Sequence, residues 1–190
     1  PFVAVGDTVH KGDTLCIIGA GPMGLLKTQI AKMRGARVIM LEKDPGRLAK
    51  AMELGADVGL NPAEHEDIAA VVRGMCNDGR GPDAVIEAVG QPATWELAID
   101  IVRKGGIVVE YGGCAKGTTI TVDTVRLHYD EITIKGSYSA TAYETEVAGT
   151  LLSRGLIKSE DYVSGVYSLE QTKEALEAHM NGKGVKFLIK

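Results

Sequence analysis

Three glycines with a regular spacing stand out among the residues that could bind a ligand. Gly19, Gly21 and Gly24 form a G-x-G-x-x-G pattern directly after the apolar run at 15–18. In such a pattern the first glycine allows a sharp turn, the second leaves room for a pyrophosphate, and the third lets the next helix pack closely on the strand. The amides and the positive dipole end of that helix attract phosphate groups. The pattern therefore predicts a strand, a turn and a helix that bind a dinucleotide.

The residues within and after this pattern agree with a helix that begins at the turn. Pro22 stands in the first helical turn, where its missing N–H costs little. Apolar residues then recur at helical spacing, and Gly35 is a suitable C-terminal cap. Pro22 and Met23 join the three glycines among the residues that we expect to contact the cofactor.

An acidic residue closes the second apolar segment. Glu42 ends the strand predicted at 37–42, where a carboxylate accepts hydrogen bonds from the adenosine ribose hydroxyls and repels a 2′-phosphate. Glu42 therefore favours NAD over NADP. Lys43 and Arg47 follow closely, and a cation there can accommodate the extra phosphate. Arg47 either contacts the ribose or remains an exposed residue in the first turn of a helix.

Two further strand ends carry small residues. The predicted strands at 83–89 and 106–111 are followed by glycines. Ligands of open α/β sheets lie beyond the C-terminal strand ends, and small residues let a flat nicotinamide ring approach the backbone. The alternative is that these glycines only form turns. The residues expected to contact the cofactor here are Val89, Tyr111, Gly112 and Gly113.

Two other side chains in this region have less obvious roles. Glu87 lies inside an otherwise apolar strand, and a buried carboxylate must be paired or protonated. It either faces the cofactor cleft or accepts hydrogen bonds from neighbouring amides, and we favour the second interpretation. Trp95, in the first turn of a predicted helix, is expected to pack rather than to stack on a base.

Strands and helices alternate from residue 14 to residue 111. The predicted strands are 14–19, 37–42, 57–61, 83–89 and 106–111, and the predicted helices are 22–34, 45–54, 64–76 and 92–103. This alternation predicts the α/β class, with a doubly wound (Rossmann), mostly parallel sheet and helices on both faces.

The pattern changes after Gly113. Residues 118–122 and 131–138 alternate apolar and polar side chains, which predicts half-exposed strands, the second at the sheet edge. A short tail follows, with helices at 143–154 and 169–181 and strands at 163–167 and 185–189. We therefore expect a lead-in segment at 1–13, a dinucleotide-binding domain at 14–138 and a C-terminal tail at 139–190.

Composition narrows the class of protein further. The chain has 190 residues, 45% of them hydrophobic, and a net charge of −4 with scattered basic residues. Such a charge distribution argues against nucleic-acid binding. No apolar run approaches the roughly 20 residues of a membrane span, and no signal sequence is visible, so we expect no membrane partner. Because the chain begins with Pro1 rather than Met, we expect the natural protein to extend further at its N-terminus.

Cysteine and histidine usage indicates neither disulfides nor metal. The cysteines are few, far apart and show no C-x-x-C pair, which is typical of reduced thiols in a cytoplasmic protein. Cys16 is expected in the core. The histidines lack metal-ligand spacing, so we expect no metal site in this chain. The chain also has no G-x-S-x-G elbow, no P-loop and no Tyr-x-x-x-Lys pair. We therefore predict no catalytic residue in it.

The segment 12–26 resembles the glycine-containing segment of medium-chain, zinc-dependent alcohol dehydrogenases. Matches to the same family continue in order at 42–48, 54–57, 83–90, 104–109 and 167–176. Within that family the chain is most similar to the polyol and threonine dehydrogenases.

This resemblance implies that the chain is the cofactor-binding domain and tail of a two-domain oxidoreductase. In the family, an N-terminal domain carries a catalytic zinc that polarises a small alcohol substrate, and a hydride passes to NAD. Zinc is thus expected only in that N-terminal domain. Members dimerise through an edge strand, which 131–138 would suit. The tail from about Tyr138 folds back onto the other domain, and Lys186 lies about where members place a basic residue over the pyrophosphate.

Two alternatives share the glycine turn and the acidic residue. One is a non-catalytic, NAD-sensing Rossmann module, against which the matching tail segments speak. The other is a methyltransferase that uses S-adenosylmethionine. The Pro-Met-Gly continuation of the turn and the small residues after the fifth strand suit a nicotinamide better.

Overall fold

The apolar run before the glycine pattern forms the central strand of a parallel sheet. In the computed structural model, which describes residues 5–6 and 8–190, β1 (Thr14–Ile18) pairs with β2 (Arg37–Leu41) on one side and β4 (Ala84–Glu87) on the other. The order is β3-β2-β1-β4-β5-β6, and every pairing described in this sheet is parallel. The remaining strands are β3 (Val58–Leu60), β5 (Ile107–Glu110) and β6 (Thr133–Gly136). The predicted doubly wound α/β class is confirmed.

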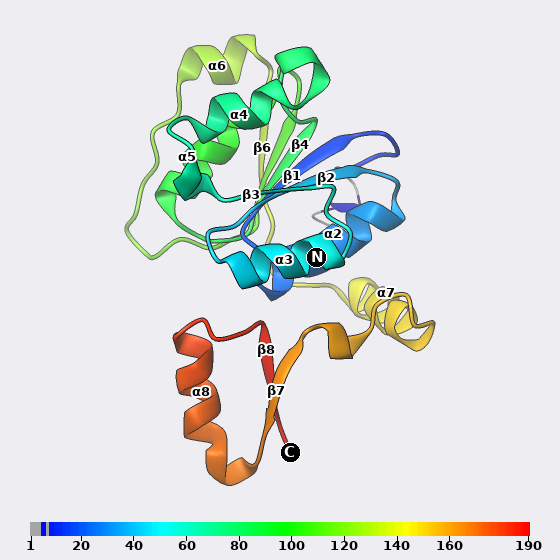
Figure 1. Cartoon of the computed structure of the whole chain (residues 1–190). Coiled ribbons are helices and arrows are strands. Elements are labelled where there is room, and N and C mark those ends of the chain that lie inside the picture. Colours follow the sequence, from blue (N-terminus) through cyan, green and yellow to red (C-terminus); the bar gives the residue numbers. More distant parts are fainter. Residues whose placement is uncertain (1–4, 7) are drawn as a thin grey trace. The chain divides into compact units, whose positions relative to one another are not determined.

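Helices cover both faces of this sheet (Figure 1). One face carries α2 (Pro22–Met33) and α3 (Pro45–Glu53), and the other carries α4 (Ile68–Gly74) and α5 (Pro92–Ile101). Because both faces are covered, the inner strands are buried on both sides, which explains their unbroken apolar runs. All five residues of β1 are buried, and Cys16 lies in the core as predicted.

The start of α4 differs from the helix predicted at 64–76. The Asn61 side chain accepts a hydrogen bond from the amide of Ala63 and begins a short 3₁₀ turn at Pro62–Glu64. Asp67 then accepts a hydrogen bond from the amide of Ala70 and caps α4. Side-chain caps therefore divide this segment, and the α-helix begins four residues later than its apolar pattern suggested.

The strand predicted at 118–122 is wrong. Ile120 and Val122 pack against the core from a segment without regular secondary structure, so their alternation reflects burial and not strand pairing. A helix that the sequence did not predict follows, α6 (Thr124–Tyr129), capped by Asp123. The segment predicted at 131–138 does contain the edge strand, β6, which pairs with β5.

The chain divides into two compact units, 1–139 and 140–190. The second unit has α7 (Ala142–Ser153), β7 (Val163–Tyr167), α8 (Thr172–Met180) and β8 (Lys186–Ile189), with β7 and β8 parallel. The first turn of the helix predicted at 169–181 is a 3₁₀ helix. Large apolar side chains of this unit are exposed, among them Tyr143, Leu152, Leu169, Leu176 and Met180.

The lead-in segment is anchored where the structure describes it. Residues 1–4 and 7, which belong to the predicted lead-in at 1–13, lie outside the described residues. Val5 and Val9 are fully buried, and the Gly12 amide donates a hydrogen bond to the Gly35 carbonyl. Across the described part of the chain, no helix has the length and apolar character needed to span a membrane.

Candidate dinucleotide-binding site

The glycine turn has the geometry that its sequence pattern requires. Gly19 has a φ of +99°, a conformation that glycine adopts without strain. A Cβ at Gly24 would overlap the carbonyl oxygen of Gly19, so the start of α2 lies directly against the turn. A Cβ at Gly21 would meet nothing within 4 Å, which leaves open space beside the backbone. Pro22 and Met23 form the first residues of α2. The helix start thus faces an open region at the end of β1.

Glu42 lies beside this turn and is held in place by two backbone amides. One carboxylate oxygen accepts a hydrogen bond from the amide of Ala20 at 2.7 Å, and the other accepts one from the amide of Asp44 at 2.9 Å. The Ala20 amide belongs to the glycine turn itself. The ends of β1 and β2 are therefore tied together, with an oriented carboxylate at the junction.

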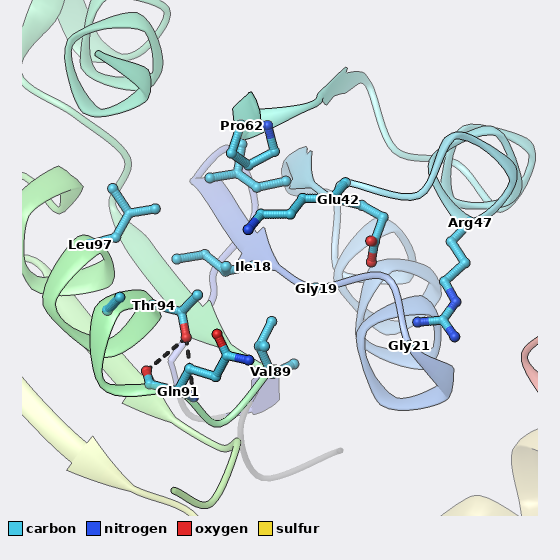
Figure 2. A pocket seen from close by; sticks show the side chains of 14 residues that line it. Ile18, Gly19, Gly21, Glu42, Arg47, Pro62, Val89, Gln91, Thr94 and Leu97 are labelled. Atoms are coloured by element: carbon cyan, nitrogen blue, oxygen red, sulfur yellow. Dashed lines mark hydrogen bonds between the residues drawn. The ribbon is translucent and has the colours of Figure 1, made fainter. Parts of the chain in front are cut away.

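A cavity of about 490 Å³ opens beside Glu42 (Figure 2). It lies at the C-terminal ends of β1, β2 and β4, where ligands of open α/β sheets bind. In Figure 2 the Arg47 side chain extends from α3 toward the glycine turn. The predicted contact residues among its lining are Gly19, Gly21, Glu42, Arg47 and Val89.

Several lining residues were not expected from the sequence. Thr94 and Leu97 lie one helical turn apart on α5, and Pro62 is the second residue after the end of β3. Gln91 precedes α5. Lys43, the cation next to Glu42 that the sequence suggested for a 2′-phosphate, also lines the cavity. Applying the strand-end rule to β3, and the helical spacing to the start of α5, would have identified Pro62, Thr94 and Leu97.

The other predicted contact residues do not line this cavity. Pro22, Met23 and Gly24 form the start of α2, and Tyr111, Gly112 and Gly113 follow β5. The turn after β5 touches the turn after β4. A Cβ at Gly90 would lie too close to the Gly113 carbonyl, and a Cβ at Gly112 would overlap the Gly90 amide. The glycines thus permit two turns to pack backbone against backbone.

Glu87 is fully buried beneath these turns and accepts several hydrogen bonds. Its carboxylate accepts from the amides of Val89 at 2.8 Å and Gly90 at 2.9 Å, and from the Thr94 hydroxyl at 2.8 Å. The preferred interpretation from the sequence, hydrogen bonding to neighbouring amides, is confirmed. Trp95 is half-buried, and its indole N–H donates to the Gly112 carbonyl at 2.9 Å, a contact that the sequence did not predict.

Two further buried ionisable groups lie nearby. Lys27, on α2, is fully buried with its Nζ 3.1 Å from the centre of the Tyr111 ring. Burial lowers the pKa of Lys27 to about 7, opposed by attraction to Glu87. Glu110 pairs in register with Glu87. Burial, followed by repulsion from Glu87, raises the pKa of Glu110 to about 8. The sequence does indicate that Lys27 and Glu110 are unusual, because each is a single charged residue in an otherwise apolar stretch.

Lys186 is the last of the residues that the family resemblance suggested for the site. Lys186 is exposed at the start of β8, and it belongs to the second unit. Within residues 5–6 and 8–190, no three or more His, Cys, Asp or Glu side chains are grouped so that they could hold a metal ion.

Comparison with known families places this architecture in a class. The model of the zinc-binding dehydrogenase family matches residues 22–154, which is more than half of the chain. The chain therefore belongs to the zinc-binding dehydrogenase family, of which it forms the nucleotide-binding domain, and the resemblance drawn from the sequence is confirmed.

Curated relatives are dehydrogenases of sugars and polyols. The D-arabitol-phosphate dehydrogenase of Enterococcus avium is 37% identical over 179 residues, which are 93% of this chain and 50% of the relative. The sorbitol dehydrogenase of Halalkalibacterium halodurans is 32% identical over 184 residues, 96% of this chain and 53% of the relative. The chain thus spans about half the length of the curated relatives it matches.

Solved structures of related enzymes have the same fold. The alcohol dehydrogenase TADH from Thermus sp. ATN1 superposes with a TM-score of 0.85 at 30% identity, over 95% of this chain and 52% of that one. A zinc-binding dehydrogenase from Sinorhizobium meliloti 1021, solved bound to NADP, superposes with a TM-score of 0.90 at 25% identity, over 98% and 55%.

Proposed function

We propose that this chain binds NAD(H) and positions the nicotinamide for hydride transfer from a small alcohol or polyol in a zinc-dependent dehydrogenase. The observation that carries the proposal is the hydrogen bond from the Ala20 amide of the glycine turn to the Glu42 carboxylate. It brings an anion-attracting helix start and a ribose-binding carboxylate to one strand end. Family membership supports this function over an NAD-sensing module or a methyltransferase.

The site residues divide into three groups along the dinucleotide. The adenosine would occupy the cavity, with its ribose on Glu42 and beside Arg47, and its base between apolar walls such as Pro62 and Leu97. The pyrophosphate would lie at the start of α2, over Gly19, Gly21, Pro22, Met23 and Gly24. The nicotinamide would reach the paired turns at Val89, Tyr111, Gly112 and Gly113.

We further propose that Glu42 selects NAD over NADP. Both of its oxygens are fixed at the cavity wall, so a 2′-phosphate would meet a carboxylate that cannot easily turn away. Lys43 and Arg47 also line the cavity and reduce this repulsion, and the S. meliloti neighbour was solved with NADP. The preference therefore depends on one carboxylate set against two cations.

This chain spans about half the length of its curated relatives, so the activity of the whole protein is a proposal that extends beyond the residues described. A zinc ion, bound by residues outside this chain, would polarise the substrate oxygen and lower its pKa. The unit 140–190 would place its exposed apolar side chains against that other part. The edge strand β6 would pair with a second copy of the chain, in a cytoplasmic protein whose cysteines are free.

Calorimetric titration tests the proposed function directly. The chain should bind NAD with a Kd between about 1 μM and 1 mM, the range usual for such substrates, and should bind S-adenosylmethionine far more weakly. Folded protein that gives no heat with NAD or NADP would refute the proposal.

Variants at two glutamates test the cofactor preference. Glu42→Ala should weaken NAD binding about tenfold and bring the NADP affinity close to it, because one desolvated charged hydrogen-bond partner is lost. Glu66→Ala, at an exposed residue outside the cavity, serves as the matched control and should bind both cofactors as the parent does. An unchanged NAD-to-NADP ratio in Glu42→Ala would remove Glu42 from the site.

A further inference from the structure

The turns after β4 and β5 form one backbone unit. Gly90 lies against Gly113, and Gly112 lies against Gly90, with no room for a Cβ at Gly90 or Gly112. The Tyr111 and Gly112 amides both donate to the backbone carbonyl of Glu87, each at 3.0 Å. A displacement of either turn would therefore displace the other.

The carboxylate of Glu87 stabilises this backbone unit through hydrogen bonds. It accepts hydrogen bonds from the amides of Val89 and Gly90 and from the hydroxyl of Thr94. The carboxylate therefore fixes both the turn after β4 and the first turn of α5. A Cβ at Gly112 would also lie against its second oxygen. The carboxylate is fully buried, which strengthens each of these charge-assisted hydrogen bonds.

Two other buried ionisable groups, Glu110 and Lys27, lie near Glu87 and differ from it in their contacts. Glu110 is its register neighbour on β5 and is only 4% exposed, and neither of its oxygens has a hydrogen-bond partner among the described residues. A carboxyl group in that position is more stable as the neutral acid. Lys27 contributes the opposing positive charge from α2. The Glu87 carboxylate thus accepts hydrogen bonds from the turn after β4, and the backbone carbonyl of the same residue accepts those of the turn after β5.

Trp95 adds a second connection between the turns. Its indole N–H donates a hydrogen bond to the Gly112 carbonyl at 2.9 Å. Trp95 lies on α5, and the Glu87 carboxylate also contacts the first turn of that helix through Thr94. The start of α5 therefore carries both turns. Neither Glu87 nor Trp95 lines the cavity at Glu42. Glu87 does hold Val89 and Thr94, which line the cavity, but within the described residues its carboxylate has no hydrogen bond with Glu42 or the glycine turn, so its effect on the adenosine end should be the smaller one.

We propose that Glu87 is a positioning residue for the nicotinamide end of the dinucleotide. It would act through the backbone of the two turns, which present their amides and carbonyls to the carboxamide, without touching the ligand itself. This inference rests on the proposed function, because it assigns the paired turns to the nicotinamide. It distinguishes the two ends of the site, since the nicotinamide end depends on Glu87 more than the adenosine end does.

Comparing NADH with ADP-ribose, which lacks the nicotinamide, tests this proposal. Glu87→Gln keeps one acceptor oxygen but removes the negative charge, which weakens the hydrogen bonds from Val89, Gly90 and Thr94. It also replaces the second oxygen, to which the Gly90 amide donates at 3.2 Å, with an NH₂ group that cannot accept. The Kd for NADH should rise about tenfold, whereas the Kd for ADP-ribose should change less than twofold. The fluorescence of bound NADH should also shift toward that of the free cofactor. Glu66→Gln, at an exposed position, is the matched control.

Trp95→Phe provides an independent variant should Glu87→Gln fold poorly. It keeps an aromatic ring but removes the donor to Gly112, so the Kd for NADH should rise about threefold with that for ADP-ribose unchanged. If either variant weakens both ligands equally, or neither ligand, the positioning role is refuted. If the parent chain binds neither ligand, the proposed function itself fails.

Discussion

The amino group of Lys27 lies over the ring of Tyr111, with Nζ 3.1 Å from the ring centre. This fully buried cation has no hydrogen-bond partner within the described residues, so the aromatic face is its principal contact. A cation–π contact recovers only part of the hydration that a buried ammonium loses. The pair joins α2, which begins at the glycine turn, to the end of β5, at a cost in stability.

Replacing Lys27 by methionine should therefore stabilise the protein. Methionine has a similar length and no charge to desolvate, so we expect a gain of about 1–3 kcal/mol in the free energy of unfolding at pH 7. Burial lowers the pKa of Lys27 from 10.5 to about 7, so the unfolded chain binds more protons between these values. The stability of the parent rises with pH in that window, and the advantage of Lys27→Met is greatest below pH 7.

Urea unfolding at several pH values measures this effect. Lys116→Met, at an exposed position, is the matched control and should leave the pH dependence unchanged. A Lys27→Met variant that is less stable than the parent at pH 6 would show that the amino group contributes more than it costs.

Glu110 should contribute a pH dependence of folding stability that is opposite in sign to that of Lys27. Its pKa rises from 4.5 to about 8 on folding, so the folded chain binds more protons between these values. The Glu110 contribution to stability is complete below pH 4.5 and is lost as the pH rises through 8. Glu110→Gln should consequently gain stability relative to the parent as the pH increases, with the largest difference above pH 8. Parallel curves of melting temperature against pH for the two proteins would contradict this assignment.

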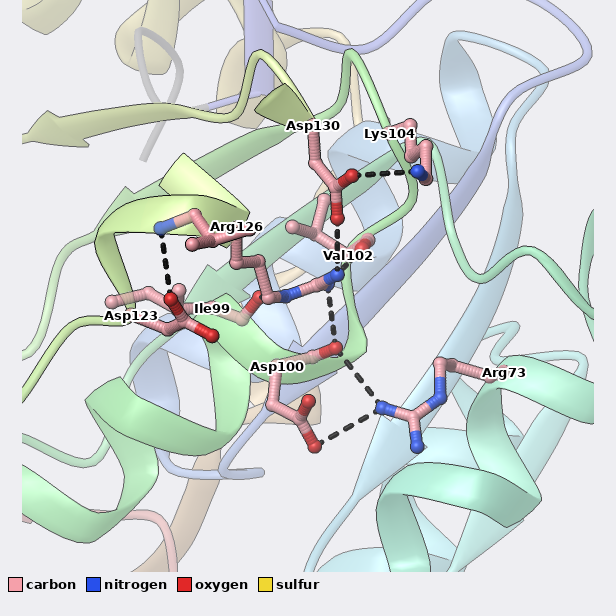
Figure 3. Close-up of polar contacts among 9 residues, drawn as sticks. Arg73, Ile99, Asp100, Val102, Lys104, Asp123, Arg126 and Asp130 are labelled. Atoms are coloured by element: carbon pink, nitrogen blue, oxygen red, sulfur yellow. Dashed lines mark hydrogen bonds and ion pairs between the residues drawn. The ribbon is translucent and has the colours of Figure 1, made fainter. Parts of the chain in front are cut away.

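Arg126 holds the C-terminal end of α5 (Figure 3). Its guanidinium donates to the carbonyls of Ile99 at 3.1 Å and Asp100 at 2.6 Å, also reaches the Val102 carbonyl, and pairs with Asp130 at 3.0 Å. These carbonyls lie at or just beyond the helix end, where intrahelical donors run out. Arg126→Ala should lower the free energy of unfolding by about 2–4 kcal/mol, because the partly buried carbonyls of Ile99 and Val102 lose this donor. The Asp100 carbonyl keeps a hydrogen bond from Arg73.

The conservative variant separates charge from geometry at this position. Arg126→Lys keeps the charge but cannot reach three carbonyls at once, so its stability in denaturant titration should fall between those of the parent and Arg126→Ala. Equal stability of the lysine variant and the parent would mean that charge alone matters here.

Two glycines of the turn should respond differently to alanine. Gly24→Ala places a methyl group on the Gly19 carbonyl and should destabilise the fold by about 2 kcal/mol or more, with loss of NADH binding. Gly21→Ala meets nothing within 4 Å, so stability should change by less than about 0.5 kcal/mol while the methyl group obstructs the pyrophosphate. Thermal melting and NADH titration of both variants test this. Normal NADH affinity in Gly21→Ala would contradict the position assigned to the pyrophosphate.

The parallel sheet was predictable because its signals are local. The continuous apolar runs of β1, β2 and β4 and the glycine turn each report on a few consecutive residues. The segment 118–122 was misread because alternation reports which side chains are buried, and strand pairing needs a partner that the segment itself does not specify. The start of α4 was displaced for a related reason, since the competing caps Asn61 and Asp67 both fit the sequence.

Part of the candidate site rests on equally local signals. Gly19 and Glu42 belong to a pattern with fixed spacing, and the structure brings them to the same cavity. The contacts of Trp95 with Gly112 and of Lys27 with Tyr111 join residues that are distant in sequence. Their geometry depends on the packing of α5 and α2 against the sheet, which residue types alone do not determine.

The two amide contacts of Glu42 have a thermodynamic consequence. A flexible acidic side chain that is captured by a ligand ordinarily gives up rotamer freedom worth about 1–2 kcal/mol. Folding has already imposed that restriction here, because Ala20 and Asp44 fix both oxygens. A ribose that reaches this carboxylate would meet an acceptor of settled orientation, so little of the association enthalpy would be offset by newly lost side-chain entropy.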